Sequence, residues 1–212
     1  MLKIVQRNIS PIQTIAFALV DYNLEKELFS FFQQKKLDDT SFNKFKNQKR
    51  KIEWLSVRYM LNELTPNFQD IEYNKYGKPF LTNLDLHISI SHSVNRIACS
   101  LNQKHETAVD IQKISPKILR IKDKFLNQHE YELIDQNDIT QLTIAWSIKE
   151  ALFKMYGKDD IFLKPNIEVT SLDFNSMKGA ASGRVVANNF DKKFNLNIEL
   201  IEDYVLAYVV NS

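Results

Sequence analysis

The stretch ITQLTIAWSIKEALFKMY at residues 139–156, with Gly157 after it, decides the fold of the C-terminal part of the chain. At 3.6 residues per turn, the apolar side chains of this stretch lie around most of the circumference of a helix. This pattern predicts a helix that is buried on most sides. Gly157 is expected to end the helix, because glycine adopts the left-handed conformation of a C-terminal cap. Within a narrow polar stripe, Glu150 and Lys154 lie four residues apart. They form either part of a crevice or an ordinary ion pair on a solvated face.

Working outward from this helix, the pattern alternates between helices and strands. Alternating or continuous apolar runs predict strands, and the longer amphipathic runs predict helices. A turn is expected within residues 71–81. We predict strands at 14–20, 86–91, 96–101, 107–112, 167–174, 184–190, 194–201 and 204–210, and helices at 24–34, 41–64 and 116–135, the last with a break near Asn127. Separate helices and mostly antiparallel strands indicate an α+β fold.

Composition narrows the function classes. The 212 residues are 44% hydrophobic and 25% charged, with a net charge of +2, which excludes global disorder and a strongly basic nucleic-acid binder. The single Cys99 excludes an internal disulfide and a cysteine-based zinc or iron–sulfur site. The longest apolar run, Ile15–Val20, is far shorter than a membrane span of about 20 residues. We therefore expect a cytoplasmic protein.

Two side chains of a predicted strand favour a cation site. Asp110 and Gln112 are two residues apart, so they share one face while their apolar neighbours take the other. An aspartate at a strand end often only caps or turns the chain. Facing a helix glutamate such as Glu150, it would instead suit Mg²⁺, which prefers oxygen ligands and is commonly held by one or two carboxylates together with substrate phosphates.

Other polar groups offer donors for phosphate oxygens. Lys78 lies in a tight Tyr-Gly-Lys-Pro turn, and Ser91 and His92 lie at the end of a strand. Each group has an ordinary alternative, namely a surface turn or a local polar cluster. The basic run at residues 44–51 is either a solvated helix face or an anion site. Taken together, these groups meet the requirements of a diphosphate site.

The chain carries four motifs whose order resembles the 4′-phosphopantetheinyl transferases of the larger, surfactin-synthetase-activating (Sfp) type. They are Tyr76–Pro79 (YGKP), Ile90–Ser93 (ISHS), Val109–Gln112 (VDIQ) and Trp146–Lys154 (WSIKEALFK). The resemblance implies transfer of the phosphopantetheine arm of coenzyme A to a serine of an acyl or peptidyl carrier protein, with 3′,5′-ADP as by-product. It also implies two similar α+β halves packed as a pseudo-dimer, with residues 1–104 on the coenzyme A side and residues 105–212 carrying the metal and catalytic residues.

The same resemblance assigns roles to individual residues. Asp110 and Glu150 match the family's Mg²⁺ ligands, and Lys154 matches its lysine near the diphosphate. The serine hydroxyl is a poor nucleophile and needs a base, and Glu150, directly or through a metal-bound water, is the base that we expect. Three further residues fall where the family contacts the phosphates of coenzyme A: Lys78, Ser91 and His92.

The chain departs from the family pattern at one position. Many relatives carry a second acidic residue where this chain has Gln112, whose amide oxygen we expect to bind the metal directly or through water. The basic region upstream has no clear match. We expect Arg50 and Arg58 to bind the adenosine 3′-phosphate, because eight residues on a helix place them roughly on one face and arginine suits phosphate oxygens.

Two other classes of protein remain as alternatives. One is a catalytically impaired protein that binds coenzyme A or a carrier, with Gln112 as a symptom of lost activity. The other is a nucleic-acid module that uses the basic run, which the net charge disfavours. The preferred interpretation is a monomeric, Mg²⁺-dependent transferase that binds neither nucleic acid nor a membrane.

Overall fold

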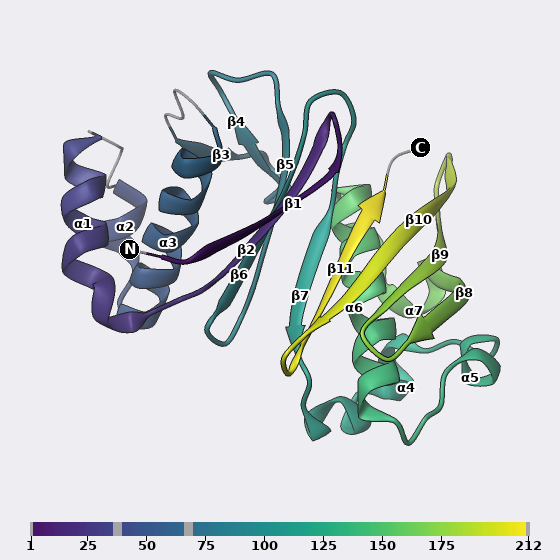
Figure 1. Ribbon diagram of the computed structural model, residues 1–212. Coiled ribbons are helices and arrows are strands. Elements are labelled where there is room, and N and C mark those ends of the chain that lie inside the picture. The colour runs from purple at the N-terminus through teal and green to yellow at the C-terminus, as the bar shows by residue number, and fades with distance from the viewer. Residues whose placement is uncertain (1, 36–39, 66–69, 211–212) are drawn as a thin grey trace.

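The computed structural model describes residues 2–35, 40–65 and 70–210, which form two antiparallel sheets side by side (Figure 1). The first sheet has the order β1-β2-β6-β5. Its strands are β1 (Ile4–Ser10), β2 (Gln13–Leu19), β6 (Arg96–Asn102) and β5 (His87–Ser93). A separate two-stranded hairpin of β3 (Ile71–Tyr73) and β4 (Pro79–Leu81) holds the Tyr-Gly-Lys-Pro turn.

The second sheet is formed by the C-terminal part of the chain and has the order β7-β11-β10-β9-β8. Three hairpin-connected strands therefore lead to β11, which pairs with the first strand of the sheet, β7. The strands are β7 (Val109–Lys113), β8 (Ile167–Asn175), β9 (Lys178–Ala187), β10 (Phe190–Ile201) and β11 (Tyr204–Val210).

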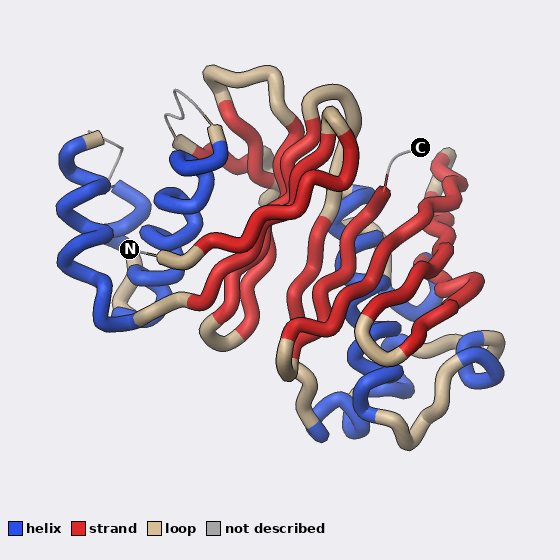
Figure 2. Tube along the Cα trace, in the orientation of Figure 1, coloured by secondary structure: helices blue, strands red, loops and turns tan. Residues whose placement is uncertain are grey.

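Each sheet has its own helices, as the colouring by secondary structure shows (Figure 2). The first sheet packs against α1 (Glu25–Gln34), α2 (Thr40–Lys44) and α3 (Gln48–Leu64). The second packs against α6 (Ile139–Tyr156), accompanied by short helices α4 (Lys122–Phe125), α5 (Glu130–Leu133) and α7 (Leu163–Asn166). Short 3-10 turns occur at Tyr22–Leu24 and Pro116–Arg120.

Helix α6 follows from its sequence at both ends and along its length. Asp138 caps the first turn by accepting hydrogen bonds from Thr140 N (2.7 Å) and Gln141 N (3.2 Å). Gly157 ends the helix with a φ of 73°, as expected from its position. Gly183 of β9 lets the helix approach the sheet closely, because a Cβ there would collide with the Leu152 side chain.

A buried ion pair ties α6 to its surroundings. The Lys149 ammonium is fully buried and lies 2.7 Å from Glu130 Oε2. It also donates to the carbonyls of Phe125 (2.6 Å) and Ile167 (2.7 Å). The other oxygen of Glu130 accepts from Val169 N at 2.6 Å. Lys149 thus connects α6 to α4, α5 and the start of β8.

The two sheets meet along a mixed apolar and polar contact. An apolar cluster is shared by β2 and β6 of one sheet and β7 and β11 of the other. Where β5 runs beside β7, serine hydroxyls take the place of a backbone ladder, and we call this row the serine seam. Its three members are Ser89, Ser91 and Ser93, which accept from Val109 N (3.1 Å), Ile111 N (3.2 Å) and Lys113 N (3.1 Å).

Further hydrogen bonds join the sheets at other points. The buried side chain of Gln13 on β2 donates to Val209 O at 2.7 Å. Tyr204 Oη on β11 donates to Asn95 Oδ1 at 2.7 Å. The contact between the sheets is therefore fixed at several points along its length.

The α+β class is confirmed, three predicted elements need correction, and one strand was not predicted. The predicted helix 41–64 is interrupted at 45–47, where Asn47 caps a new helix by accepting from Lys49 N at 2.9 Å. The predicted helix 116–135 is divided into a 3-10 turn and the short helices α4 and α5, and the expected break near Asn127 lies between α4 and α5. The predicted strand 184–190 crosses a hairpin turn at which Asn189 has a φ of 59°. Strand β1 was not predicted. Across residues 2–35, 40–65 and 70–210, the structure contains no helix long and apolar enough to span a membrane.

Candidate active site

The candidate site is centred on Asp110 of β7, a buried carboxylate whose two oxygens have different surroundings. Oδ1 accepts hydrogen bonds from Lys154 Nζ and from Ser91 Oγ, both at 2.8 Å. Oδ2 is buried and has no hydrogen-bond partner among the residues that the structure describes. A buried carboxylate oxygen is costly to leave unpaired, so this atom is a candidate ligand for a cation.

Glu150 of α6 is the second carboxylate of the site. Burial, and then the charge of Asp110, raise its pKa to about 7, while Lys154 acts in the opposite direction. The structure therefore brings the strand aspartate and the helix glutamate close enough to repel each other. Lys154, one turn further along α6, pairs with Asp110 and donates to Val109 O at 3.0 Å. It is used in this crevice rather than in an ion pair on a solvated face.

A divalent cation fits the donors present. Asp110, Glu150 and the partly buried Gln112 each offer a side-chain oxygen, the ligand atom that Mg²⁺ prefers. Asp110 and Gln112 share a face of β7 because strand side chains alternate. Over the described ranges, no group of three or more His, Cys, Asp and Glu side chains gathers as a metal site. The candidate set therefore consists of two carboxylates and one amide.

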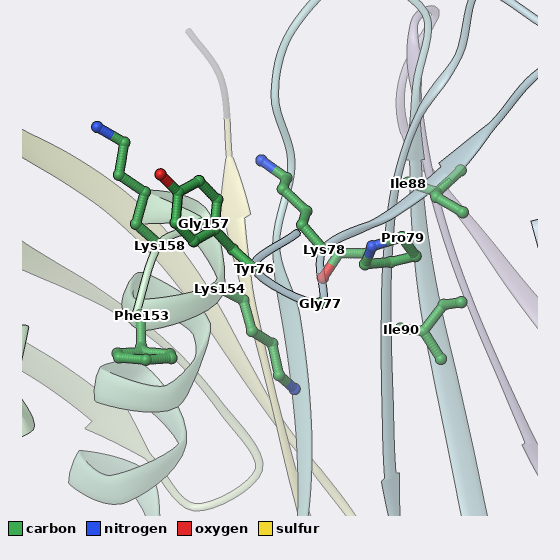
Figure 3. A pocket seen from close by; sticks show the side chains of 11 residues that line it. Tyr76, Gly77, Lys78, Pro79, Ile88, Ile90, Phe153, Lys154, Gly157 and Lys158 are labelled. Carbon is green, nitrogen blue, oxygen red and sulfur yellow. The ribbon is translucent and has the colours of Figure 1, made fainter. Parts of the chain in front are cut away.

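A pocket opens beside these groups, between the Tyr-Gly-Lys-Pro turn and the C-terminal end of α6 (Figure 3). Figure 3 shows Lys78 on the turn side, with Lys154 and Lys158 on the helix side. Lys78 forms an ion pair with Glu106, and its side chain packs beside Gly157. Ile88, Ser89 and Ile90 of β5 line the wall. The pocket thus gathers cationic side chains from both halves of the chain.

A second pocket lies on the other side of Ile90, against α3. Arg50 Nη1 donates to Glu53 Oε2 at 2.8 Å and contacts His92 Nε2. Arginine has only donors, so the histidine nitrogen accepts, which requires a neutral ring. Burial and the charge of Arg50 lower the His92 pKa, in agreement with the neutral form.

Arg58 also lines this second pocket but is buried and already partnered. Its guanidinium lies 2.8 Å from Asp70 and 3.4 Å from the centre of the Trp54 ring. Burial lowers its pKa, although Asp70 opposes this shift. The structure therefore brings Arg50 and Arg58 to one pocket, Arg50 with an exposed guanidinium and Arg58 with an enclosed one.

Two residues that shape these pockets were not predicted from the sequence. Glu53 holds Arg50 and lies 4.0 Å from His92, and Glu106 holds Lys78. Neither belongs to a motif. Glu106 is 28 residues from Lys78 in sequence, whereas Glu53 is three residues from Arg50 on α3, a spacing at which helical side chains can pair. The serine seam did leave a signal. Serines at every second position from 89 to 93 predict a polar strand face that packs against something.

The sequence is similar to proteins of known function. Residues 106–209 match the family model of the 4′-phosphopantetheinyl transferase superfamily. The chain resembles a 4′-phosphopantetheinyl transferase. The resemblance inferred from the four motifs is thereby confirmed, and the matched residues include Asp110, Glu150 and Lys154.

Three curated relatives extend the match to such transferases. The chain is 28% identical to the 4′-phosphopantetheinyl transferase gsp of Aneurinibacillus migulanus, over 67% of this chain and 65% of the relative. It is 32% identical to the 4′-phosphopantetheinyl transferase Sfp of Bacillus subtilis (strain 168), over 49% of this chain and 47% of the relative. It is 30% identical to the 4′-phosphopantetheinyl transferase AcpT of Escherichia coli (strain K12), over 51% of this chain and 59% of the relative. The chain thus spans between 47% and 65% of the length of these three transferases.

Proposed function

We propose that this protein transfers the 4′-phosphopantetheine arm of coenzyme A to a serine of an apo acyl or peptidyl carrier protein. The observation that carries this proposal is the meeting of Asp110, Glu150 and Lys154, from a strand and a helix, beside a pocket lined with lysines. Such a group suits a reaction at a diphosphate, where positioning and neutralisation of charge supply most of the catalysis.

Mg²⁺ is the metal that the oxygen-only donor set suits best. Asp110, Glu150 and Gln112 would hold it, Asp110 through the buried Oδ2 that lacks a protein partner. When bound, the ion would neutralise charge on the diphosphate of coenzyme A. Lys154 and Lys78 add positive charge from the protein itself on either side of the pocket.

The two halves of the chain would have different roles in the reaction. Residues 1–104 would hold coenzyme A, with Arg50, Arg58 and His92 of the second pocket toward the adenosine 3′-phosphate. Residues 105–212 would carry the metal ligands and Lys154. Coenzyme A would then lie across the contact between the sheets. We further propose that the protein works as a monomer in the cytoplasm.

The chemical step needs a base for the carrier serine, because a hydroxyl is a poor nucleophile. We propose that Glu150 accepts this proton as the serine oxygen forms its bond to the phosphorus that carries the pantetheine arm. The bond from that phosphorus to the bridging oxygen breaks, and 3′,5′-ADP leaves with the electron pair. In the metal-free protein, burial and the charge of Asp110 raise the pKa of Glu150 to about 7, which makes this carboxylate a stronger base than an exposed one.

The decisive experiment mixes the protein with coenzyme A, Mg²⁺ and an apo carrier domain, and weighs the carrier by mass spectrometry. A gain of one phosphopantetheine, absent with the Asp110→Asn variant, is expected. Binding of coenzyme A or carrier without any gain in mass would favour the impaired binding protein. Binding of neither, with retention of nucleic acid, would favour the nucleic-acid module.

A charge change at Gln112 tests the metal site. Gln112→Glu adds a third carboxylate, and ligand charge tunes the affinity of oxygen sites, so we expect roughly tenfold tighter Mg²⁺ activation of transfer. Without metal the three carboxylates repel one another, so the melting temperature in EDTA should fall and recover with Mg²⁺. Gln112→Leu is the matched control that removes the oxygen, and it should weaken activation. Unchanged metal dependence in both variants would contradict the assignment.

Arg50 tests the coenzyme A end of the site. Arg50→Ala should raise the KM for coenzyme A about tenfold, the equivalent of one charged hydrogen bond, with little change in kcat. Lys49→Ala is a neighbouring control, because the Lys49 ammonium lies over the Tyr22 ring rather than in the second pocket. An equal effect of both variants, or a loss confined to kcat, would count against a role for Arg50 in binding.

A further inference from the structure

The serine seam has one member that differs from the other two. All three serines accept a backbone N–H of β7, so each contributes the same kind of bond to the contact between the sheets. Only Ser91 also donates to a carboxylate, at 2.8 Å from Asp110 Oδ1. Its hydroxyl therefore links the backbone of β7 to the side chain at the centre of the candidate site.

The direction of these two bonds is fixed by the chemistry of a hydroxyl group. The Ser91 hydroxyl has one proton, and its oxygen accepts a hydrogen bond from the N–H of Ile111. The hydroxyl therefore donates its proton in the hydrogen bond to Asp110. Asp110 Oδ1 must then be an unprotonated acceptor. Lys154 donates to that same oxygen at 2.8 Å. Two donors thus converge on Oδ1, while Oδ2 has no partner in the described part of the chain.

This arrangement selects one orientation of the carboxylate. The terminal torsion of an aspartate has broad preferences and leaves the group free to turn unless neighbours hold it. Two donors, one on β5 and one on α6, form hydrogen bonds to Oδ1. The orientation that satisfies both leaves Oδ2 available to a ligand.

We propose that Ser91 is a positioning residue for Asp110: it holds Oδ1 across the serine seam so that Oδ2 is presented to a divalent cation. The proposal rests on the proposed function, since it takes Asp110 as a metal ligand. It gives Ser91 a role different from contact with a phosphate of coenzyme A. Partners behind a metal ligand orient it, and losing one typically lowers metal affinity by about 10–100-fold.

The test measures Mn²⁺ binding by the full chain without coenzyme A or carrier, by the loss of the electron paramagnetic resonance signal of free Mn²⁺. Mn²⁺ suits the same oxygen ligands as Mg²⁺. Ser91→Ala should weaken Mn²⁺ binding roughly 10–100-fold. Ser93→Ala is the matched control, because it removes the same kind of bond to β7 and touches no carboxylate in the structure. It should bind Mn²⁺ as the wild type does.

Two further variants separate positioning from folding. Ser91→Thr keeps the hydroxyl and should restore the affinity for Mn²⁺. Ser91→Cys keeps the volume with a much weaker donor, and it replaces Ser91→Ala if that variant does not fold. In transfer assays at saturating Mg²⁺, the KM for coenzyme A of Ser91→Ala should stay close to the wild-type value.

Several results would overturn the proposal. These are wild-type Mn²⁺ affinity in Ser91→Ala, equal losses in Ser91→Ala and Ser93→Ala, no Mn²⁺ binding by the wild type, or a defect of Ser91→Ala confined to the KM for coenzyme A. Failure of the proposed function looks different. In that case no carrier gains mass, while the Mn²⁺ affinities of the variants keep the expected order and the positioning role stands.

Discussion

Glu150→Gln should abolish transfer while leaving coenzyme A bound within a few-fold of the wild-type affinity. The amide cannot take the serine proton, and general base catalysis alone contributes about 10²–10⁴-fold. The amide also removes one of the two negative charges that would hold the metal. The coenzyme A contacts that we propose for the pocket on α3 should not be affected, because that pocket is lined by residues of the other half of the chain. Mass spectrometry of the carrier and calorimetry with coenzyme A measure the two effects.

The fold of this variant provides a separate check. Glu150 is a partly buried charge beside Asp110, so its replacement by a neutral amide removes a repulsion. The melting temperature in EDTA should therefore not fall and should rise slightly. Glu132→Gln, an acid-to-amide change at an exposed position of α5, is the control and should leave transfer intact. Substantial turnover by Glu150→Gln would remove Glu150 from the mechanism.

Lys149→Met should instead damage the fold. Lys149 is next to Glu150 in sequence, but its ammonium is buried against Glu130 and main-chain carbonyls. Breaking a buried ion pair from one side leaves an uncompensated charge, which costs about 3–5 kcal/mol of the free energy of unfolding. For a chain of this size, that corresponds to a fall in melting temperature of roughly 6–20 °C.

Two further variants define the outcome for Lys149. Lys164→Met is the control, since the Lys164 ammonium also donates to a carbonyl, that of Asp123, but at an exposed position. It should change the free energy of unfolding by about 0.5 kcal/mol or less. The double variant Lys149→Met with Glu130→Gln should recover part of the loss, because the uncompensated charge is gone. A Lys149→Met protein that is fully stable but inactive would instead make Lys149 part of the catalytic machinery.

These two adjacent residues show what the sequence could predict. The helix 139–156 was predicted with its exact limits because an almost fully apolar pattern and a glycine cap are local signals. The polar stripe with Glu150 and Lys154 was also visible. The role of Lys149 was not, because its partner Glu130 lies on a short helix at a distance in sequence that no periodicity reveals. The motif groups residues that the fold uses for different purposes.

The errors in the fold have similarly local causes. Strand β1 (Ile4–Ser10) lies at the edge of its sheet and is partly exposed, so it lacks the apolar alternation of a half-buried strand. The hairpin turn at 188–189 contains neither glycine nor proline, since Asn189 supplies the positive φ. Helices α2 and α3 were merged because the break between them depends on a single capping residue, Asn47. Each error comes from a tertiary contact or from a single residue. The local pattern of apolar and polar residues does not reveal such effects.

The serine seam has a consequence for how substitutions can inactivate the protein. Side-chain hydroxyls join the sheets at β5 and β7, so each sheet keeps its own backbone ladder if the halves drift apart. The candidate site would not survive such a drift, because Ser91 belongs to one half and Asp110 to the other. Substitutions far from the pockets, at inter-sheet contacts such as Gln13 or Tyr204, can therefore silence the protein while its circular dichroism spectrum stays normal. Inactive variants of this kind would be mistaken for catalytic ones unless the docking of the halves is measured directly.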